Sequence, residues 1–204
     1  MIPYTAQTLP LIFVIGATNA GKSTLLDTVR SYPGIGMIEV GKMMRAKYPP
    51  EHFAGHANPT HTQAEAWMMF GSRVIECAAE GCRVAFVDGQ PRDITQCESI
   101  LALPNPKCFL HLWAPIDVRE ERARKRDSEP GVPDVDNQKL QLALKRVIGD
   151  IPKLYDVTQR IRSLARSGRR AMDPVIIDYD TNGPEYAPFS AASRVFGFLT
   201  GEQF

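Results

Sequence analysis

A glycine-rich stretch near the start of the chain combines residue types that are suited to holding phosphate. Residues 16–23 read Gly-Ala-Thr-Asn-Ala-Gly-Lys-Ser and satisfy the pattern G-x-x-x-x-G-K-[ST]. An apolar run precedes this stretch and a helix-like segment, residues 22–30, begins inside it, which is the strand–loop–helix context that a phosphate-binding loop requires. The alternative is a glycine-rich turn without a ligand. We expect ATP to bind at Gly16, Ala17, Thr18, Asn19, Ala20, Gly21, Lys22, Ser23 and Thr24.

The spacing of these residues has a chemical reason. Glycines let successive backbone N–H groups turn toward an anion, and the N-terminus of the following helix adds its positive dipole. Lys22 can reach the β- and γ-phosphates, and the Ser23 hydroxyl can ligate Mg²⁺. Asp88 ends a later apolar run, where an acid can hold the same ion, usually through water; a turn or helix-cap aspartate is the other interpretation. We therefore expect Mg²⁺ as a cofactor, held by Ser23 and Asp88.

Five short apolar runs supply the elements that must position these groups. They are too short and too rich in β-branched or aromatic residues to be helices, and helix-like segments separate them. Buried strands that alternate with helices indicate a parallel sheet covered on both faces. The fold class that we expect is α/β, a three-layer P-loop NTPase fold with a five-stranded parallel sheet. The expected strands are residues 11–15, 36–40, 83–87, 108–113 and 175–177, and the expected helices are 22–30, 62–80, 116–126 and 137–166, the last one broken near Pro152.

Length and composition bound the remaining possibilities. A chain of 204 residues with 44% apolar residues fits a single domain, residues 1–204, with two polar excursions at 48–60 and 127–136. A net charge of +1 gives no reason to expect DNA or a membrane surface as a partner. The four cysteines show no C-x-x-C pair, which favours reduced thiols and a cytoplasmic protein. No apolar run reaches the roughly 18 residues of a membrane span.

Three stretches beyond the loop resemble the nucleoside monophosphate kinases, the adenylate kinase-like family. Residues 88–96 read Asp-Gly-Gln-Pro-Arg-Asp-Ile-Thr-Gln and are similar to that family's D-G-F-P-R-x-x-x-Q. Residues 38–46 read Ile-Glu-Val-Gly-Lys-Met-Met-Arg-Ala and are similar to its I-S-T-G-D-M-L-R-A. Residues 116–126 resemble its arginine-bearing helix after the fourth strand. The matches follow the family's order and spacing over most of the chain.

The resemblance implies a role for each matching residue. Arg45 and Arg92 would bind the phosphate of the acceptor nucleotide, because guanidinium groups match oxyanions, and Gln96 would hydrogen-bond the acceptor base. Arg122 and Arg126 lie four residues apart on one helix face and would span the donor and the transferred group. The implied acceptor-binding residues are Gly41, Arg45, Arg92 and Gln96, in a flap of about residues 41–80, and the implied catalytic residues are Lys22, Arg92, Arg122 and Arg126, beside a short lid at about 127–136. The family's usual arginine after the lid is missing, and we expect Arg146 on the following helix to take its catalytic place. Solvated surface charge is the preferred interpretation of Arg119, Arg124 and Lys125.

Several positions depart from the family pattern. The usual Ser-Thr before Gly41 is Glu39-Val40 and the Asp after it is Lys42, so the acceptor's identity is open. Glu39 could accept a hydrogen bond from a donor group of a base or sugar, or it could be a surface acid. Three histidines, His52, His56 and His61, lie within ten residues but lack the scaffold of a metal site. A basic patch is interpreted as a solvated helix end, with nucleic-acid contact as the alternative, at Arg162, Arg166, Arg169 and Arg170.

These observations favour one function and leave two alternatives. The favoured one is ATP- and Mg²⁺-dependent phosphoryl transfer to a nucleoside or deoxynucleoside monophosphate, giving the diphosphate, with ATP and that monophosphate as partners. The first alternative keeps the donor site but phosphorylates a hydroxyl of a modified nucleoside, a metabolite or a nucleic acid. The second is a nucleotide-binding switch with little turnover. Oligomeric state and acceptor base are left open.

Overall fold

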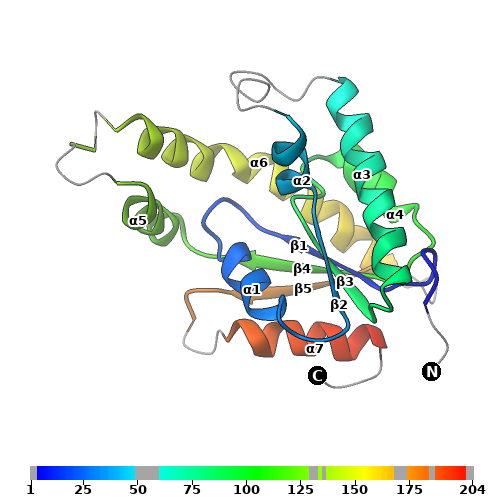
Figure 1. Ribbon diagram of the computed structural model, residues 1–204. Coiled ribbons are helices and arrows are strands. Elements are labelled where there is room, and N and C mark those ends of the chain that lie inside the picture. Colours follow the sequence, from blue (N-terminus) through cyan, green and yellow to red (C-terminus); the bar gives the residue numbers. More distant parts are fainter. Residues whose placement is uncertain are drawn as a thin grey trace.

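A sheet of five parallel strands organises the chain, as the computed structural model in Figure 1 shows. The structure describes residues 4–48, 60–128, 133–134, 137–167, 174–183 and 187–200. The strands are β1 (Leu11–Ile15), β2 (Ile35–Glu39), β3 (Val84–Asp88), β4 (Lys107–Trp113) and β5 (Val175–Asp180). The helices are α1 (Lys22–Val29), α2 (Val40–Lys47), α3 (Thr60–Ala79), α4 (Ile94–Leu101), α5 (Ile116–Asp127), α6 (Gln138–Ser167) and α7 (Pro188–Thr200).

The strand order β2-β3-β1-β4-β5 places β1 in the middle of the sheet. Every neighbouring pair is parallel, so all the carboxyl ends lie along one edge. The chain builds β2 and β3 on one side of β1, and then β4 and β5 on the other. In open sheets of this kind, ligands bind outside the carboxyl ends where the strand order reverses. That point is the end of β1, directly before the glycine-rich loop.

The register of the strands fixes which side chains are neighbours at this edge. Val14 on β1 lies opposite Asp88 on β3, and Asp88 also lies opposite Glu39 on β2. On the other side, Ile15 lies opposite His111 on β4. The register therefore brings Asp88 beside the strand that leads into the loop.

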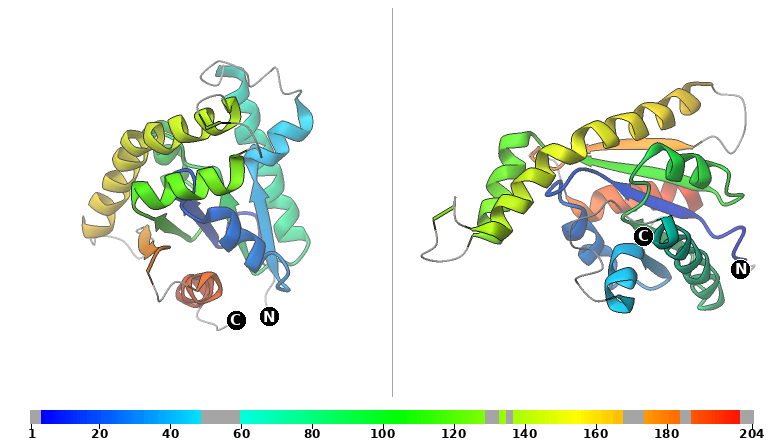
Figure 2. Two further views of the ribbon diagram at one scale, coloured as in Figure 1. Left: turned by 90° about the vertical axis from the view of Figure 1, so that its left-hand side faces the viewer. Right: turned by 90° about the horizontal axis from the view of Figure 1, so that it is seen from above.

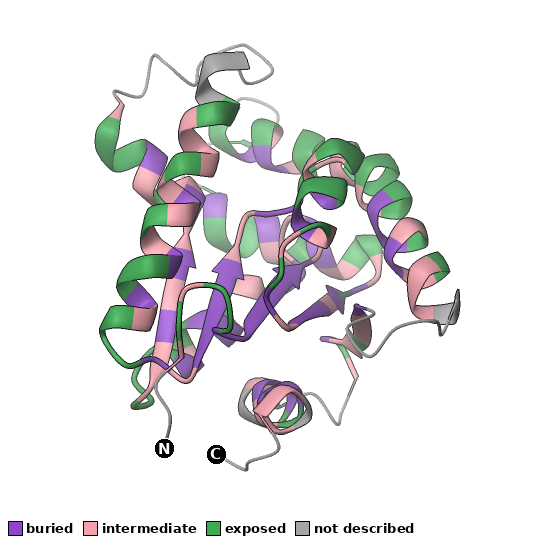
Figure 3. Cartoon of the chain, turned by 90° about the vertical axis from the view of Figure 1, so that its right-hand side faces the viewer, coloured by how far each residue is buried: buried purple, intermediate pink, exposed green. Residues whose placement is uncertain are grey.

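Helices cover both faces of the sheet, as Figure 2 shows. Successive side chains of β1 point to opposite faces, and every residue of this strand is buried. Leu11, Phe13 and Ile15 pack under α3, α4 and α6. Ile12 and Val14 pack against α1 and α7. Figure 3 shows the buried strands between helices whose outer faces are exposed. The expected five-stranded parallel sheet with helices on both faces is confirmed.

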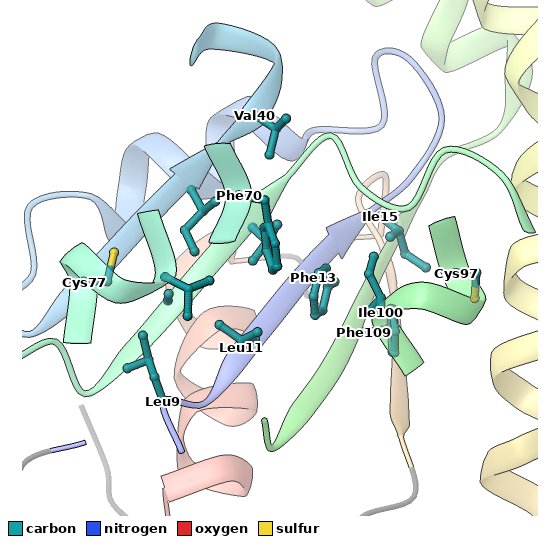
Figure 4. Close-up of a cluster of buried hydrophobic side chains, with 14 of the residues drawn as sticks. Leu9, Leu11, Phe13, Ile15, Val40, Phe70, Cys77, Cys97, Ile100 and Phe109 are labelled. Atoms are coloured by element: carbon teal, nitrogen blue, oxygen red, sulfur yellow. The ribbon is translucent and has the colours of Figure 1, made fainter. Parts of the chain in front are cut away.

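Stacked aromatic side chains lie in the core that α3, α4 and α6 form with the sheet, shown in Figure 4. The ring of Phe13 stacks on Phe109 of β4 at 5.3 Å between centroids and lies 6.2 Å from Phe70 of α3. Trp67, one turn earlier on α3, stacks on Phe70 at 5.1 Å. These contacts connect α3 to the middle of the sheet, so the segment that precedes β3 is held by packing.

The break that the sequence predicts near Pro152 is wrong, because α6 is one helix from Gln138 to Ser167 with Pro152 inside it. Proline has no N–H group to donate, so one bond of the helical ladder is missing, and a bend is the usual result. Figure 2 shows this bend. Buried residues on both sides of the proline, Val147 before it and Val157 and Ile161 after it, hold the two halves to the rest of the molecule.

Among the helices that the structure describes, none combines the length and apolar character of a membrane span.

Candidate functional site

The loop after β1 has a backbone that only particular residues can form. A Cβ atom on Gly16 would lie 2.4 Å from the carbonyl oxygen of Leu112, so this position requires glycine. Asn19 and Gly21 adopt left-handed conformations with φ of 63° and 88°. Such turns direct successive N–H groups toward one concavity, where an anion can bind. The N-terminus of α1 follows at once, and no described side chain caps it.

Lys22, the first residue of α1, is folded back onto the loop. Its Nζ donates hydrogen bonds to the carbonyl oxygens of Gly16 at 2.6 Å and Ala17 at 3.0 Å. Burial lowers the pKa of the Lys22 amine, and the nearby carboxylates of Asp88 and Asp150 oppose that shift. The amine is therefore a poorly solvated charge beside the loop, which an anion could bind in place of the two carbonyl groups.

A cavity of about 740 Å³ opens over this loop. This volume is in the range of small-molecule and cofactor sites. Its lining combines the loop and the start of α1 with two arginines of α5 and the segments that follow β5: Thr18, Asn19, Gly21, Lys22, Ser23, Thr24, Arg122, Arg126, Thr181 and Pro188.

The two arginines of α5 reach the cavity in different ways. Arg122 donates to the carbonyl oxygens of Asn19 at 3.2 Å and Thr181 at 2.9 Å, and to the Thr181 hydroxyl at 2.9 Å. It therefore connects α5 to the loop and to the end of β5. Arg126 donates to Asp127 with its Nε and Nη2 atoms. This hydrogen bond is the main reason that the pKa of Asp127 is lowered.

A third arginine of α5 is not where the sequence predicts it. Arg119 was expected to be a solvated surface charge, but it is buried, with 5% of its surface exposed. Its guanidinium donates to the carbonyl oxygens of Ala114 and Val147, and so joins α5 to α6. Arg124 and Lys125 are exposed on α5 as expected, in ion pairs with acidic neighbours.

The two residues expected to hold Mg²⁺ lie at the same edge of the sheet. Ser23 lines the cavity. Asp88 ends β3, and its Oδ1 atom is buried without a hydrogen-bond partner among the residues that the structure describes. A buried carboxylate oxygen without a partner is unfavourable, and a bound cation or its water would satisfy it. The oxygen donors of Ser23 and Asp88 therefore suit Mg²⁺.

Arg45 and Arg92 converge at the N-terminus of α2. A Cβ atom built on Gly41 would lie 3.4 Å from Nη1 of Arg45 and 3.4 Å from Nη2 of Arg92. Arg92 also donates from Nε to the carbonyl oxygen of Gly89 at 3.0 Å. Neither guanidinium forms an ion pair with a described residue, so two neighbouring positive charges lie beside the uncapped first turn of α2. This arrangement is suited to an anionic group.

Gln96 has a local role besides the expected contact with a base. Asp93 caps the N-terminus of α4 by accepting a hydrogen bond from the Gln96 backbone N–H at 2.9 Å. In return, Gln96 Oε1 accepts from the Arg92 backbone N–H at 2.9 Å. This reciprocal pattern is a variant of the capping box. It leaves the amide N–H₂ group of Gln96 for a ligand and fixes the backbone of Arg92.

Glu39 lies between two basic side chains. Its carboxylate is 2.8 Å from Nη1 of Arg30 and 2.6 Å from Nζ of Lys42. Its oxygens are thus already engaged by two cations. The geometry favours a neutralised acid at the end of β2 over an acid that binds the hydroxyl or amine of a ligand.

Several predicted residues are not brought to the cavity. The Arg146 side chain is exposed on α6 and forms no hydrogen bond or ion pair with any described residue. Arg162 pairs with Asp178, which also contacts His111. The other predictions fall on segments outside the described residues: most of the polar excursion and flap tip with His52 and His56, most of the short lid, the side chains of His61 and Arg166, and Arg169 and Arg170.

Three residues at the cavity and loop were missed by sequence reasoning. Thr181 and Pro188 line the cavity, and Asp150 of α6 accepts hydrogen bonds from Thr18. Thr181 directly follows β5, and the rule that all carboxyl ends of a parallel sheet share one edge could have found it. No sequence pattern marks Asp150.

Comparison with known proteins gives the fold and little else. No protein-family model matches the chain, and no curated protein matches it. One solved structure, a sugar kinase from Janibacter sp. HTCC2649 in unliganded form, is similar over 94% of both chains with a TM-score of 0.57 and 18% sequence identity. In all, 193 solved chains match, so the fold is widely shared. The chain shares the α/β fold of that structure, and the likeness alone identifies neither an activity nor a substrate.

Proposed function

We propose that this protein transfers the terminal phosphoryl group of ATP, with Mg²⁺, to a nucleoside or deoxynucleoside monophosphate and forms the diphosphate. One observation carries the proposal: two cationic subsites lie along the same edge of the sheet. The first is the cavity over the glycine-rich loop, and the second is the pair Arg45 and Arg92 beside Gly41. Both lie at the carboxyl edge of the sheet, because Arg92 follows the end of β3, and β3 pairs with β1, the strand that leads into the loop.

The loop side suits the donor. The N–H groups of the loop and of the first turn of α1 would hold the phosphates of ATP, and Lys22 would exchange its two carbonyl contacts for phosphate oxygens. Ser23 and Asp88 would hold Mg²⁺, which neutralises phosphate charge when it is bound. Arg122 and Arg126 line the same cavity and would stabilise charge on the transferred group.

The α2 side suits the acceptor. A monophosphate carries two negative charges near neutral pH, and Arg45 and Arg92 are two guanidinium groups that no described acid neutralises. No protein nucleophile is needed, because an oxygen of the acceptor phosphate attacks the γ-phosphorus while ADP leaves. The free amide N–H₂ of Gln96 is the remaining candidate contact for the base. Arg146 does not line the cavity, so it could act in the proposed reaction only if it moved toward the cavity.

A second candidate keeps the donor site and uses a hydroxyl acceptor. Two observations favour it: Val40 lacks the hydroxyl that the family pattern supplies there, and the similar solved structure is described as a sugar kinase. The paired guanidinium groups favour the phosphate acceptor, because a neutral hydroxyl does not need two cations. An acidic sugar would combine features of both, since its carboxylate would suit the same pair.

A coupled ADP-release assay separates these candidates. Wild-type protein would be supplied with ATP, Mg²⁺ and a panel of ribo- and deoxynucleoside monophosphates, together with neutral and acidic sugars. We expect turnover with one or more monophosphates and no turnover in Lys22→Ala. Turnover with sugars alone would replace the proposal by the second candidate. ATP binding without turnover on any acceptor would instead support a nucleotide-dependent switch.

A further inference from the structure

Asp150 of α6 has no role in the proposed reaction, but it holds the loop through Thr18. Its Oδ2 atom accepts hydrogen bonds from the Thr18 backbone N–H at 3.0 Å and from the Thr18 hydroxyl at 2.5 Å. The two residues are 132 positions apart in the chain. Asp150 is partly buried, and α6 passes beside the loop in the two views of Figure 2.

The Asp150 carboxylate accepts a hydrogen bond from a backbone N–H that the loop itself does not pair. The left-handed turn at Asn19 interrupts the regular backbone hydrogen bonding of the loop, and leaving a partly buried N–H group unpaired costs free energy. Both donors of Thr18 meet a single charged oxygen, and hydrogen bonds to a charged group are stronger than neutral ones. The first half of the loop therefore has a defined partner before any ligand binds.

Two further contacts connect the same part of the loop to the helices beside it. The Asn19 side chain donates to the carbonyl oxygen of Arg119 at 3.2 Å. Arg119 in turn donates to the carbonyl oxygen of Val147, three residues before Asp150. Thr18 and Asn19 are thus connected to α6 both directly and through α5.

We propose that Asp150 is a positioning residue for nucleotide binding, which holds Thr18 so that the loop is ordered against α6 before ATP or ADP arrives. This inference rests on the proposed function, because it assumes that the loop binds nucleotide phosphate. A role as the base that deprotonates a hydroxyl acceptor is disfavoured, since Oδ2 already accepts both Thr18 bonds. Ordering the loop in advance reduces the entropy lost on binding, so the effect falls on affinity.

The test measures the affinity of Mg²⁺·ADP and Mg²⁺·ATP by calorimetry for a set of variants. Asp150→Ala should weaken both nucleotides by about 10-fold, the size of one charge-assisted hydrogen bond. Asp150→Asn should stay within about 3-fold of wild type, because its amide oxygen can still accept both bonds. Thr18→Val removes the hydroxyl donor alone and should weaken binding by about 3-fold. Asp156→Ala, an exposed acid on the same helix, is the matched control.

A double-mutant cycle and steady-state kinetics complete the test. Thr18→Val combined with Asp150→Ala should bind nucleotide as Asp150→Ala does, because the two side chains share one interaction. With an acceptor that is turned over, Asp150→Ala should raise the KM for ATP while kcat and the acceptor KM stay within about 2-fold, a split that a general loss of stability does not produce.

Different results overturn different statements. Wild-type affinity or tighter binding in Asp150→Ala, additive effects in the cycle, or an Asp150→Asn variant as weak as the alanine variant would each overturn the positioning role of Asp150. If Asp150→Ala does not fold, Asp150→Asn and Thr18→Val still decide the question. A wild-type protein that binds neither nucleotide would overturn the proposed function itself, and this inference with it.

Discussion

Replacement of Arg92 by alanine should separate the acceptor site from the donor site. Arg92 is exposed, and among the described residues its side chain forms one hydrogen bond, from Nε to the carbonyl oxygen of Gly89. Its Nη atoms are left for a ligand beside Gly41. Two charge-assisted hydrogen bonds to a phosphate would be lost, each about 1.5–3 kcal/mol and not fully additive. We expect kcat/KM for the monophosphate to fall by about 30- to 700-fold, corresponding to about 2–4 kcal/mol.

The affinity for ATP should barely change, because Arg92 does not line the cavity over the loop. The free energy of unfolding measured in urea should change by less than about 0.5 kcal/mol, as it does for most substitutions of exposed side chains. The matched control is Arg124→Ala on α5, an exposed arginine in ion pairs with acidic neighbours, which should keep wild-type kinetics. The measurements are steady-state ADP release at varied acceptor concentration and ATP binding by calorimetry. An equal loss of ATP affinity and transfer in Arg92→Ala would refute the assignment of this arginine to the acceptor.

Three further predictions concern packing and charge. Phe13 lies in the core between Phe70 and Phe109, so Phe13→Ala should lower the free energy of unfolding in urea by about 3–5 kcal/mol. A decrease of less than about 1 kcal/mol would contradict the packing described. The thiols should react slowly with a disulfide reagent at pH 8 and rapidly after denaturation, because all four are buried and burial raises the pKa of Cys77 to about 12; rapid native labelling would contradict this. Asp127 has a pKa below its ordinary 3.8 in the folded protein, chiefly because Arg126 donates to it, so its contribution to stability is present at neutral pH and is lost as the pH falls through that lowered pKa. The difference in unfolding free energy between wild type and Asp127→Asn should therefore shrink from pH 7 toward pH 3, and a constant difference would exclude the carboxylate as its cause.

The strands were the most predictable part of the fold. A buried parallel strand needs apolar side chains on both faces, and few other segments of this chain meet that condition. The expected strand at 11–15 is confirmed residue for residue, and β3 differs from its expected position by one residue at each end. The first of these strands also located the loop, because the loop pattern is meaningful only directly after a strand.

Helices were predicted less well, since their signals depend on neighbours that the sequence does not show. The sequence patterns did not predict α2, α4 or α7 as helices. For α7 the signal was present, because Ala191, Ala192, Val195 and Phe196 recur at helical spacing and form one buried face. The continuity of α6 through Pro152 could not be predicted, because packing on both sides offsets the missing hydrogen bond.

The sequence predicted some contacts of the candidate site and missed others. Arg45 and Arg92 both lie beside Gly41, and their role toward an acceptor stays a prediction. Arg119 shows the limit of residue type as a guide, because a charged helix residue is normally solvated and this one is buried against backbone carbonyl groups. Asp150 shows another limit, because its partner Thr18 is distant in the chain and an acid in a helix has no distinctive pattern.

The alignment of β1 with β3 has a consequence for how this protein can evolve. Asp88 is positioned by its register opposite Val14. Adding or removing one residue inside β3 would turn every later side chain of the strand to the opposite face, and would move Asp88 away from the edge that the loop occupies. Substitutions along this strand can be absorbed one at a time, whereas a change of length cannot. We therefore expect lineages that descend from this sequence to vary in the length of their loops and to keep the length of β3 constant.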